Sequence, residues 1–90
     1  MTKRIAIMVR GRQSEALRMA VGAILLDDDI HVYILDHGLD ETKEIALYLE
    51  TLNDLDIPVF TNCAENPELQ QLSADEIARR LSGYDHVIAY

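Results

Sequence analysis

The chain has 90 residues, 49% of them apolar, and a net charge of −8. This length predicts a single domain over residues 1–90, and the acidic balance excludes non-specific binding to nucleic acid or to an anionic membrane surface. Because no apolar stretch is long enough for a membrane span or a signal segment and there is only one cysteine, we expect a cytoplasmic protein.

Apolar patterning predicts four strands that alternate with helices. Residues 4–9 are almost wholly apolar, as in a strand buried on both faces. The helix after them has paired i, i+4 apolar spacing behind Ser14, which we expect to cap it. Ser73 and Glu76 form a capping box, and Gly83 ends that helix. In chain order we expect strand 4–9, helix 14–25, strand 30–35, helix 42–52, strand 57–61, a short helix from Asn66 and Pro67 to Leu72, helix 73–81 and strand 87–89.

This alternation predicts the fold class, a small three-layer α/β/α domain. Strands separated by helices form a mainly parallel sheet through right-handed crossovers, so we expect four strands between two helical layers. The pattern alone leaves the strand order open between 2-1-3-4 and 3-2-1-4.

Cys63 is the residue on which the functional interpretation depends. It follows the third predicted strand, at the strand-to-helix corner where ligands and chemistry collect in parallel α/β sheets. A single thiol forms no internal disulfide, so Cys63 is a buried apolar residue, a surface residue without a role, or a nucleophile. The third reading requires a thiolate at neutral pH, which needs nearby positive charge or a helix N-terminus.

Two other segments supply candidate binding residues at the same edge. Arg10, Gly11 and Arg12 lead into the first predicted helix, an arrangement suited to a small anion, although one glycine is not a phosphate-binding fingerprint. His37 follows the second strand and is a candidate acid, base or partner of a thiolate. Surface solubility or subunit pairing explains the arginines equally well, and a histidine in this position often does no more than end a strand.

The sequence predicts no metal site and no cofactor. Asp27, Asp28 and Asp29 lie at the opposite end of the sheet from the ligand edge and are typical of a solvated turn. His31 and His86 have no placement that indicates a function, and scattered histidines with one cysteine do not make a zinc site. A nucleotide-binding module is disfavoured because no glycine-rich loop is present.

The chain resembles the DsrE/DsrF-like family, which includes the sulfur-relay subunits TusB, TusC and TusD. The resemblance covers nearly the whole chain and rests on the order and spacing of its segments. These segments are the apolar first strand and its glycine-containing loop, the helix at 14–20, the strand at 32–35 followed by Gly38 and Leu39, the strand at 57–60 leading to Cys63, and the closing segment at 81–90.

The resemblance implies a 3-2-1-4 sheet, assembly into trimers or hexamers of like or related subunits, and a persulfide on Cys63. In that role Cys63 receives sulfur from a carrier protein, as an accessory to sulfur transfer. The segment after Cys63, residues 64–72, is shorter than in the family, which displaces the helix that would help to activate the thiolate. Some members lack the cysteine, so the alternative is a non-catalytic oligomeric subunit that binds a small anion or a partner protein.

Overall fold

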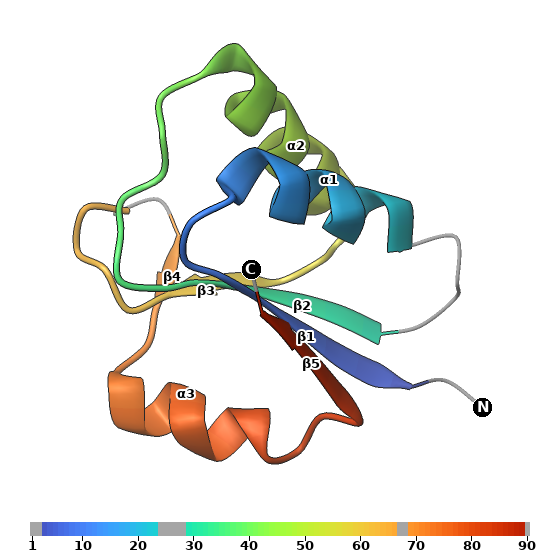
Figure 1. The fold of residues 1–90 in the computed structure, drawn as a ribbon, viewed down its shortest axis with the longest axis vertical. Coiled ribbons are helices and arrows are strands. Elements are labelled where there is room, and N and C mark those ends of the chain that lie inside the picture. Colours follow the sequence, from blue (N-terminus) through green and yellow to red (C-terminus); the bar gives the residue numbers. More distant parts are fainter. Residues whose placement is uncertain (1–2, 24–28, 67–68, 90) are drawn as a thin grey trace.

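A computed structural model describes residues 3–23, 29–66 and 69–89. These residues form three helices and five strands, which alternate except that no helix separates the third strand from the fourth (Figure 1). In order they are β1 (Arg4–Val9), α1 (Gln13–Ala23), β2 (Asp29–Ile34), α2 (Lys43–Asp54), β3 (Val59–Thr61), β4 (Gln70–Gln71), α3 (Ala74–Leu81) and β5 (His86–Ala89).

The strands form one parallel sheet in the order β4-β3-β2-β1-β5. The four predicted strands therefore stand in the 3-2-1-4 order, and the alternative 2-1-3-4 order is wrong. The expected count of four is also wrong, because Gln70 and Gln71 pair with Phe60 and Thr61 as a fifth, edge strand.

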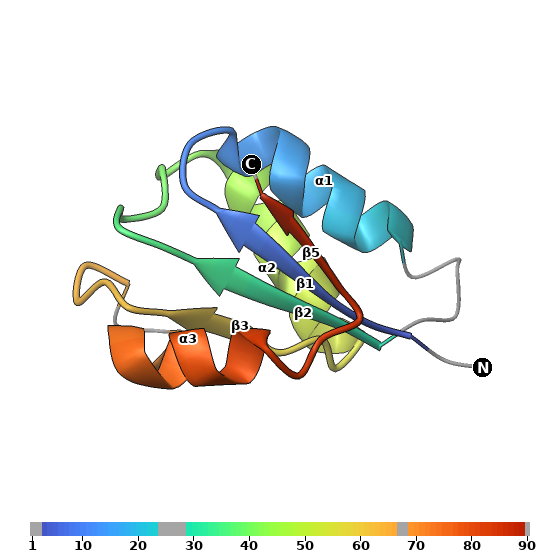
Figure 2. The ribbon, with the colours of Figure 1, turned by 60° about the horizontal axis from the view of Figure 1, so that its bottom comes forward.

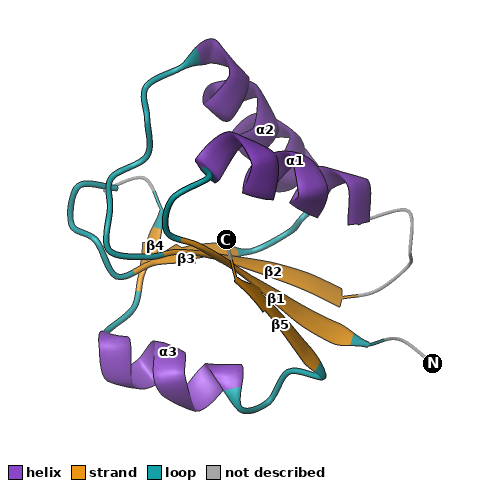
Figure 3. Cartoon of the chain, viewed as in Figure 1, coloured by secondary structure: helices purple, strands orange, loops and turns teal. Residues whose placement is uncertain are grey.

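The helices lie in two layers, with α1 and α2 on one face of the sheet and α3 on the other (Figure 3). Alternate residues of β1 serve the two faces, as expected of a strand buried on both sides. Ile5, Ile7 and Val9 pack into the core under α1 and α2, whereas Ala6 packs into the core under α3. The three-layer α/β/α fold predicted from the sequence is confirmed.

Local capping explains where two of the helices begin. The Thr42 and Ser73 side chains accept hydrogen bonds from the backbone N–H groups of Ile45 and Glu76, at 3.1 Å in each case, so each helix has a satisfied first turn. Ser14 does not cap α1, because that helix already begins at Gln13.

The expected short helix from Asn66 and Pro67 to Leu72 is wrong over the described part of that segment. Gln70 and Gln71 are extended and bonded to β3, and Leu72 donates a backbone hydrogen bond to the Thr61 carbonyl. Pro67 lies outside the described residues, as do Asp27 and Asp28 of the acidic run and the expected helix end at 24–25.

Candidate functional site

The carboxyl ends of β1, β2 and β3 point to one edge of the sheet, where the three following loops lie (Figure 2). The predicted site residues are distributed over these loops. Arg10, Gly11 and Arg12 follow β1, His37 follows β2, and Cys63 follows β3. The parallel sheet thus brings all five to the same edge.

Cys63 is a free cysteine held by its backbone and partly exposed at its side chain. Its N–H donates to the Thr61 hydroxyl at 3.1 Å. Its carbonyl oxygen accepts from the Asn66 N–H at 3.1 Å and from the Gln71 side-chain amide at 3.2 Å. These three bonds fix both sides of the peptide chain at Cys63, so the thiol sits on a defined turn and still reaches solvent.

Asn66 is the buried polar residue that organises this edge, with only 6% of its surface exposed. Its side-chain N–H₂ donates to the His37 carbonyl and to the Thr61 hydroxyl, each at 3.1 Å. Its side-chain oxygen accepts from the Leu39 N–H at 2.8 Å. One side chain therefore joins the turn of Cys63, the end of β3 and the loop after β2. The sequence shows only an Asn-Pro pair, which reads equally well as the start of a helix.

Gln13, also buried, holds the other side of the loop after β2. Its side-chain N–H₂ donates to the Gly38 carbonyl at 3.0 Å, and its side-chain oxygen accepts from the Asp40 N–H at 2.8 Å. Sequence reasoning placed Gln13 in a loop and gave it no role. No spacing rule identifies it, because its partners are two backbone groups that lie about 25 residues further along the chain.

The arginines face carboxylates. Arg10 Nε lies 3.2 Å from Asp36 Oδ2, with both side chains about half exposed, and Arg12 Nη1 lies 3.9 Å from Glu15 Oε2. Asp36 is itself fixed by Asn62, which accepts from its N–H at 2.9 Å and donates to its carboxylate at 3.2 Å. The positive charge of the predicted anion site is therefore directed at acids of the same chain.

Gly11 and His37 contribute less than their positions suggested. A Cβ on Gly11 would meet no atom within 4 Å, and its φ is not positive, so the backbone there does not require glycine. His37 takes part through its carbonyl oxygen, which accepts from Asn66, whereas its side chain is exposed. The structure brings the turn of Cys63 to the backbone of His37 and keeps the Arg10 guanidinium with Asp36.

A cavity of about 640 Å³ opens beside this turn. Glu65 and Asn66 form one wall, and the opposite wall comes from the loop before α2 and from α2 itself. The lining residues are Leu39, Asp40, Glu41, Thr42, Lys43, Ile45, Ala46, Leu49, Glu65, Asn66 and Leu69. In the part of the chain that the structure describes, no three His, Cys, Asp or Glu side chains are grouped so as to hold a metal ion.

Comparison of the chain with protein-family models, with curated proteins and with solved structures finds no match. None of the helices formed by the described residues is long and apolar enough to cross a membrane.

Proposed function

We propose that the protein is a DsrE-like sulfur-relay protein that carries a persulfide on Cys63. The observation that carries this proposal is the placement of the one cysteine at the carboxyl edge, free, partly exposed and fixed by three backbone-directed hydrogen bonds. A strand order that matches the one implied by the resemblance also supports it. A carrier needs a thiol that a partner can reach and that returns to one position after each transfer.

The reaction is an exchange of one sulfur atom. The Cys63 thiolate attacks the outer sulfur of a donor persulfide, the donor's S–S bond breaks, and the donor leaves as a thiolate that takes up a proton. Cys63 then holds an S–SH group. An acceptor thiolate attacks the outer sulfur of that group and restores the Cys63 thiolate, so the relay needs no external oxidant or reductant.

The thiolate must be favoured by groups at the edge of the sheet. The first turn of α3, which begins at Ala74, is eleven residues from Cys63 in sequence, so the helix that immediately follows a strand in many α/β sites is replaced here by the turn at Cys63. Arg10 supplies positive charge to Cys63 only if its guanidinium leaves Asp36, 3.2 Å away. We propose that Arg10, Gly11, Arg12 and His37 form the face on which a donor or acceptor protein docks.

The test is sulfur loading of the folded protein followed by intact-mass measurement. Incubation with inorganic polysulfide should add the mass of one sulfur atom to the wild-type chain, and reduction should remove it. Because Cys63 is the single cysteine, the Cys63→Ser variant is a complete control and should gain no sulfur. Equal loading of the serine variant, or no loading of the wild type, overturns the proposal.

The pH dependence of Cys63 alkylation provides a second test, of whether the thiol forms a reactive thiolate in the folded protein. The denatured chain provides the reference for an unperturbed thiol, which titrates near 8.5. A relay thiol should react with an inflection at or below about pH 7 in the folded protein. A folded protein that does not react at all, or one that reacts like the denatured chain, contradicts the proposal.

A non-catalytic, oligomeric DsrE-like subunit is the second candidate, and the exposure of β5 favours it. Val87 is 45% exposed, and His86 and Ala89 are exposed beside it, although these residues belong to a sheet. Apolar surface and an open strand edge suit contact with like or related subunits. Small-anion binding has less support, because Arg10 and Arg12 face carboxylates. Sedimentation equilibrium that gives a strict monomer at micromolar concentration would count against this candidate.

A further inference from the structure

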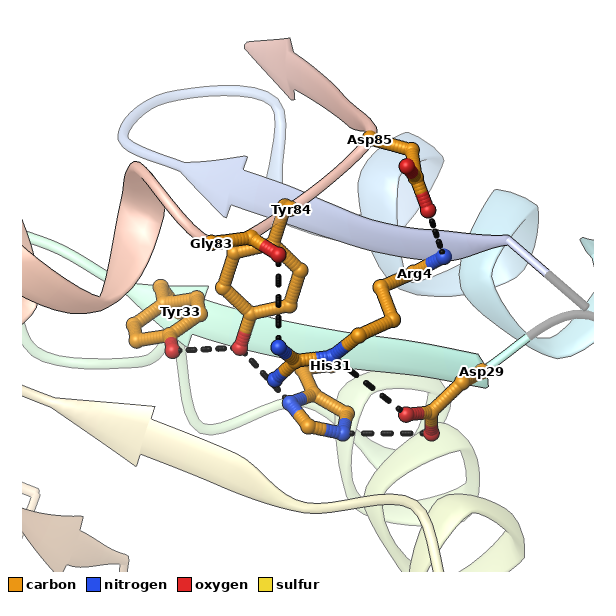
Figure 4. A network of polar contacts seen from close by, with 7 residues as sticks. All are labelled: Arg4, Asp29, His31, Tyr33, Gly83, Tyr84 and Asp85. Atoms are coloured by element: carbon orange, nitrogen blue, oxygen red, sulfur yellow. Dashed lines mark hydrogen bonds and ion pairs between the residues drawn. The ribbon is translucent and has the colours of Figure 1, made fainter.

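A chain of polar contacts lies on the face of the sheet that α3 covers and runs along β2 from Asp29, its first residue, to Tyr33 (Figure 4). Tyr33, which is fully buried, has its hydroxyl 2.6 Å from the hydroxyl of Tyr84. The Tyr84 hydroxyl also lies 2.6 Å from Nδ1 of His31. Nε2 of His31 lies 3.2 Å from Oδ1 of Asp29. We call these four residues the Tyr33–Asp29 chain.

The number of protons shared by the residues of the Tyr33–Asp29 chain determines which group donates in each of its hydrogen bonds. Between Tyr33, Tyr84 and Nδ1 of His31 there are two contacts, and two hydroxyl protons fill them when His31 is neutral. Tyr33 then donates to Tyr84, Tyr84 donates to Nδ1, and the Nε2–H of His31 donates to Asp29. Every polar atom has a partner in this arrangement, which requires the Nε2–H form of His31.

A proton added to His31 has no free contact to occupy. The new Nδ1–H must donate to the Tyr84 oxygen, which displaces the Tyr84 proton from that contact. Either Tyr33, which is fully buried, is then left with an O–H that has no acceptor in the chain, or the O–H of Tyr84, which is half-buried, must turn away from the chain. Leaving a buried donor unpaired is costly, because the hydroxyl has already lost its hydrogen bonds to water.

Charged groups of both signs lie around His31. Asp29, the carboxylate that faces it, is about half exposed and already shared with Arg4, whose Nε lies 3.8 Å from its Oδ2. The Arg4 guanidinium also lies 4.8 Å from the centre of the Tyr84 ring. From α3, Arg80 lies 5.1 Å from the Phe60 ring, and that ring is 6.2 Å from the ring of His31. Asp29 favours a positive charge on His31 but is shared with Arg4, and Arg80 is paired with Glu76 at 3.4 Å, so the response to protonation rests on the count of protons and contacts.

The chain joins β2 to the segment that leads into β5. His31 and Tyr33 belong to β2, whereas Tyr84 lies two residues before the start of β5. On the side of β1, Arg4 holds the same segment: its N–H donates to the Asp85 carboxylate at 2.7 Å, and its side chain donates to the Gly83 carbonyl at 3.2 Å. The Arg4 carbonyl also accepts from the Asp85 N–H at 2.8 Å. Tyr84 is thus the residue through which the sheet interior holds this segment.

We propose that the Tyr33–Asp29 chain is an acid-sensitive latch that holds the segment Gly83–Ala89 on the sheet when His31 is neutral and loosens it when His31 is protonated. This inference is independent of sulfur chemistry at Cys63.

The first test is the tautomer of His31, read from ring ¹⁵N shifts in the wild-type protein at about pH 8. We expect an unprotonated Nδ1 and a protonated Nε2. A ring that carries its proton on Nδ1 overturns the proposal, because the count of two protons in two contacts then fails. This measurement needs no variant.

The second test is hydrogen exchange of the Val87 amide at about pH 8 and about pH 5, corrected for the intrinsic exchange rate. In a parallel edge strand only alternate N–H groups face the neighbouring strand, and because the Asp85 N–H donates to the Arg4 carbonyl, the Val87 N–H lies on the side of β1. Wild-type protection of this amide should fall by about tenfold at the lower pH. His31→Gln keeps a neutral acceptor and should remove this loss, whereas His37→Gln, which changes an exposed histidine, should retain it.

An acid loss of protection that persists in His31→Gln, or one that disappears in His37→Gln, overturns the proposal. If His31→Gln fails to fold, Tyr84→Phe provides the same comparison. Removing the Tyr84 hydroxyl deletes the contacts through which His31 and Tyr33 hold this segment, so protection should be low at both pH values and its loss in acid should again disappear. A wild-type protein whose β5 protection is equal at the two pH values also overturns it.

Discussion

The side chain of Asn66 donates a hydrogen bond to the carbonyl oxygen of His37 at 3.1 Å, and so ties the turn after β3 to the loop after β2. The two residues are 29 positions apart in the chain. The bond is one of three that the buried Asn66 side chain makes, and the others engage Thr61 and Leu39. The geometry of the carboxyl edge therefore depends on one amide.

Replacing Asn66 with alanine should destabilise the protein by roughly 2–3 kcal/mol, because it leaves buried groups of the two loops without partners. Urea unfolding measures this loss. Asn53→Ala is the matched control, since Asn53 is exposed near the end of α2 and its loss should stay within about 0.5 kcal/mol. Equal losses in the two variants would contradict the central role of Asn66.

Asp56 should be replaceable by glycine with a gain in stability. It follows the end of α2 with φ of 57°, a left-handed conformation that glycine adopts without steric cost. We expect Asp56→Gly to raise the unfolding free energy by about 0.5–1 kcal/mol. Asp54→Gly removes the same charge but places glycine at the last residue of α2, so it should be less stable than Asp56→Gly. The reverse order in urea unfolding would refute the backbone argument.

Tyr84 should make the protein sensitive to alkali. Burial raises the pKa of Tyr84 above its ordinary value of 10.0. Above about pH 10 the unfolded chain releases this proton while the folded chain keeps it, so the free energy of unfolding falls as pH rises and is unaffected by this group at lower pH.

Urea unfolding between about pH 8 and about pH 11.5 measures this effect, with Tyr84→Phe as the comparison. Above about pH 10 the free energy of unfolding should fall more steeply with pH in the wild type than in the variant, by a slope that corresponds to the release of up to about one proton on unfolding. Below that pH the two curves should run parallel. Parallel curves over the whole range would show that the folded state does not retain the Tyr84 proton.

The alternation of apolar runs with segments of helical apolar spacing was sufficient to predict the three-layer parallel fold. The spacing of apolar residues within a segment indicates whether that segment is buried on one face or on two. The same local order misled at residues 69–72. Asn66 and Pro67 are a typical start for a helix, but Gln70 and Gln71 pair with β3 instead. A two-residue edge strand has no periodicity, so only its neighbour reveals it.

The sequence by itself determined that Arg10, His37 and Cys63 follow successive strands of a parallel sheet, because strand identity and direction follow from local patterns. Tertiary structure alone decided the neighbours of each side chain. It directed Arg10 to Asp36, Asn66 to His37, and His31 to Tyr84. His31 is a histidine that no sequence pattern selects. These contacts join residues 26 to 53 positions apart, and their distances depend on how strands and loops pack, which no single segment encodes.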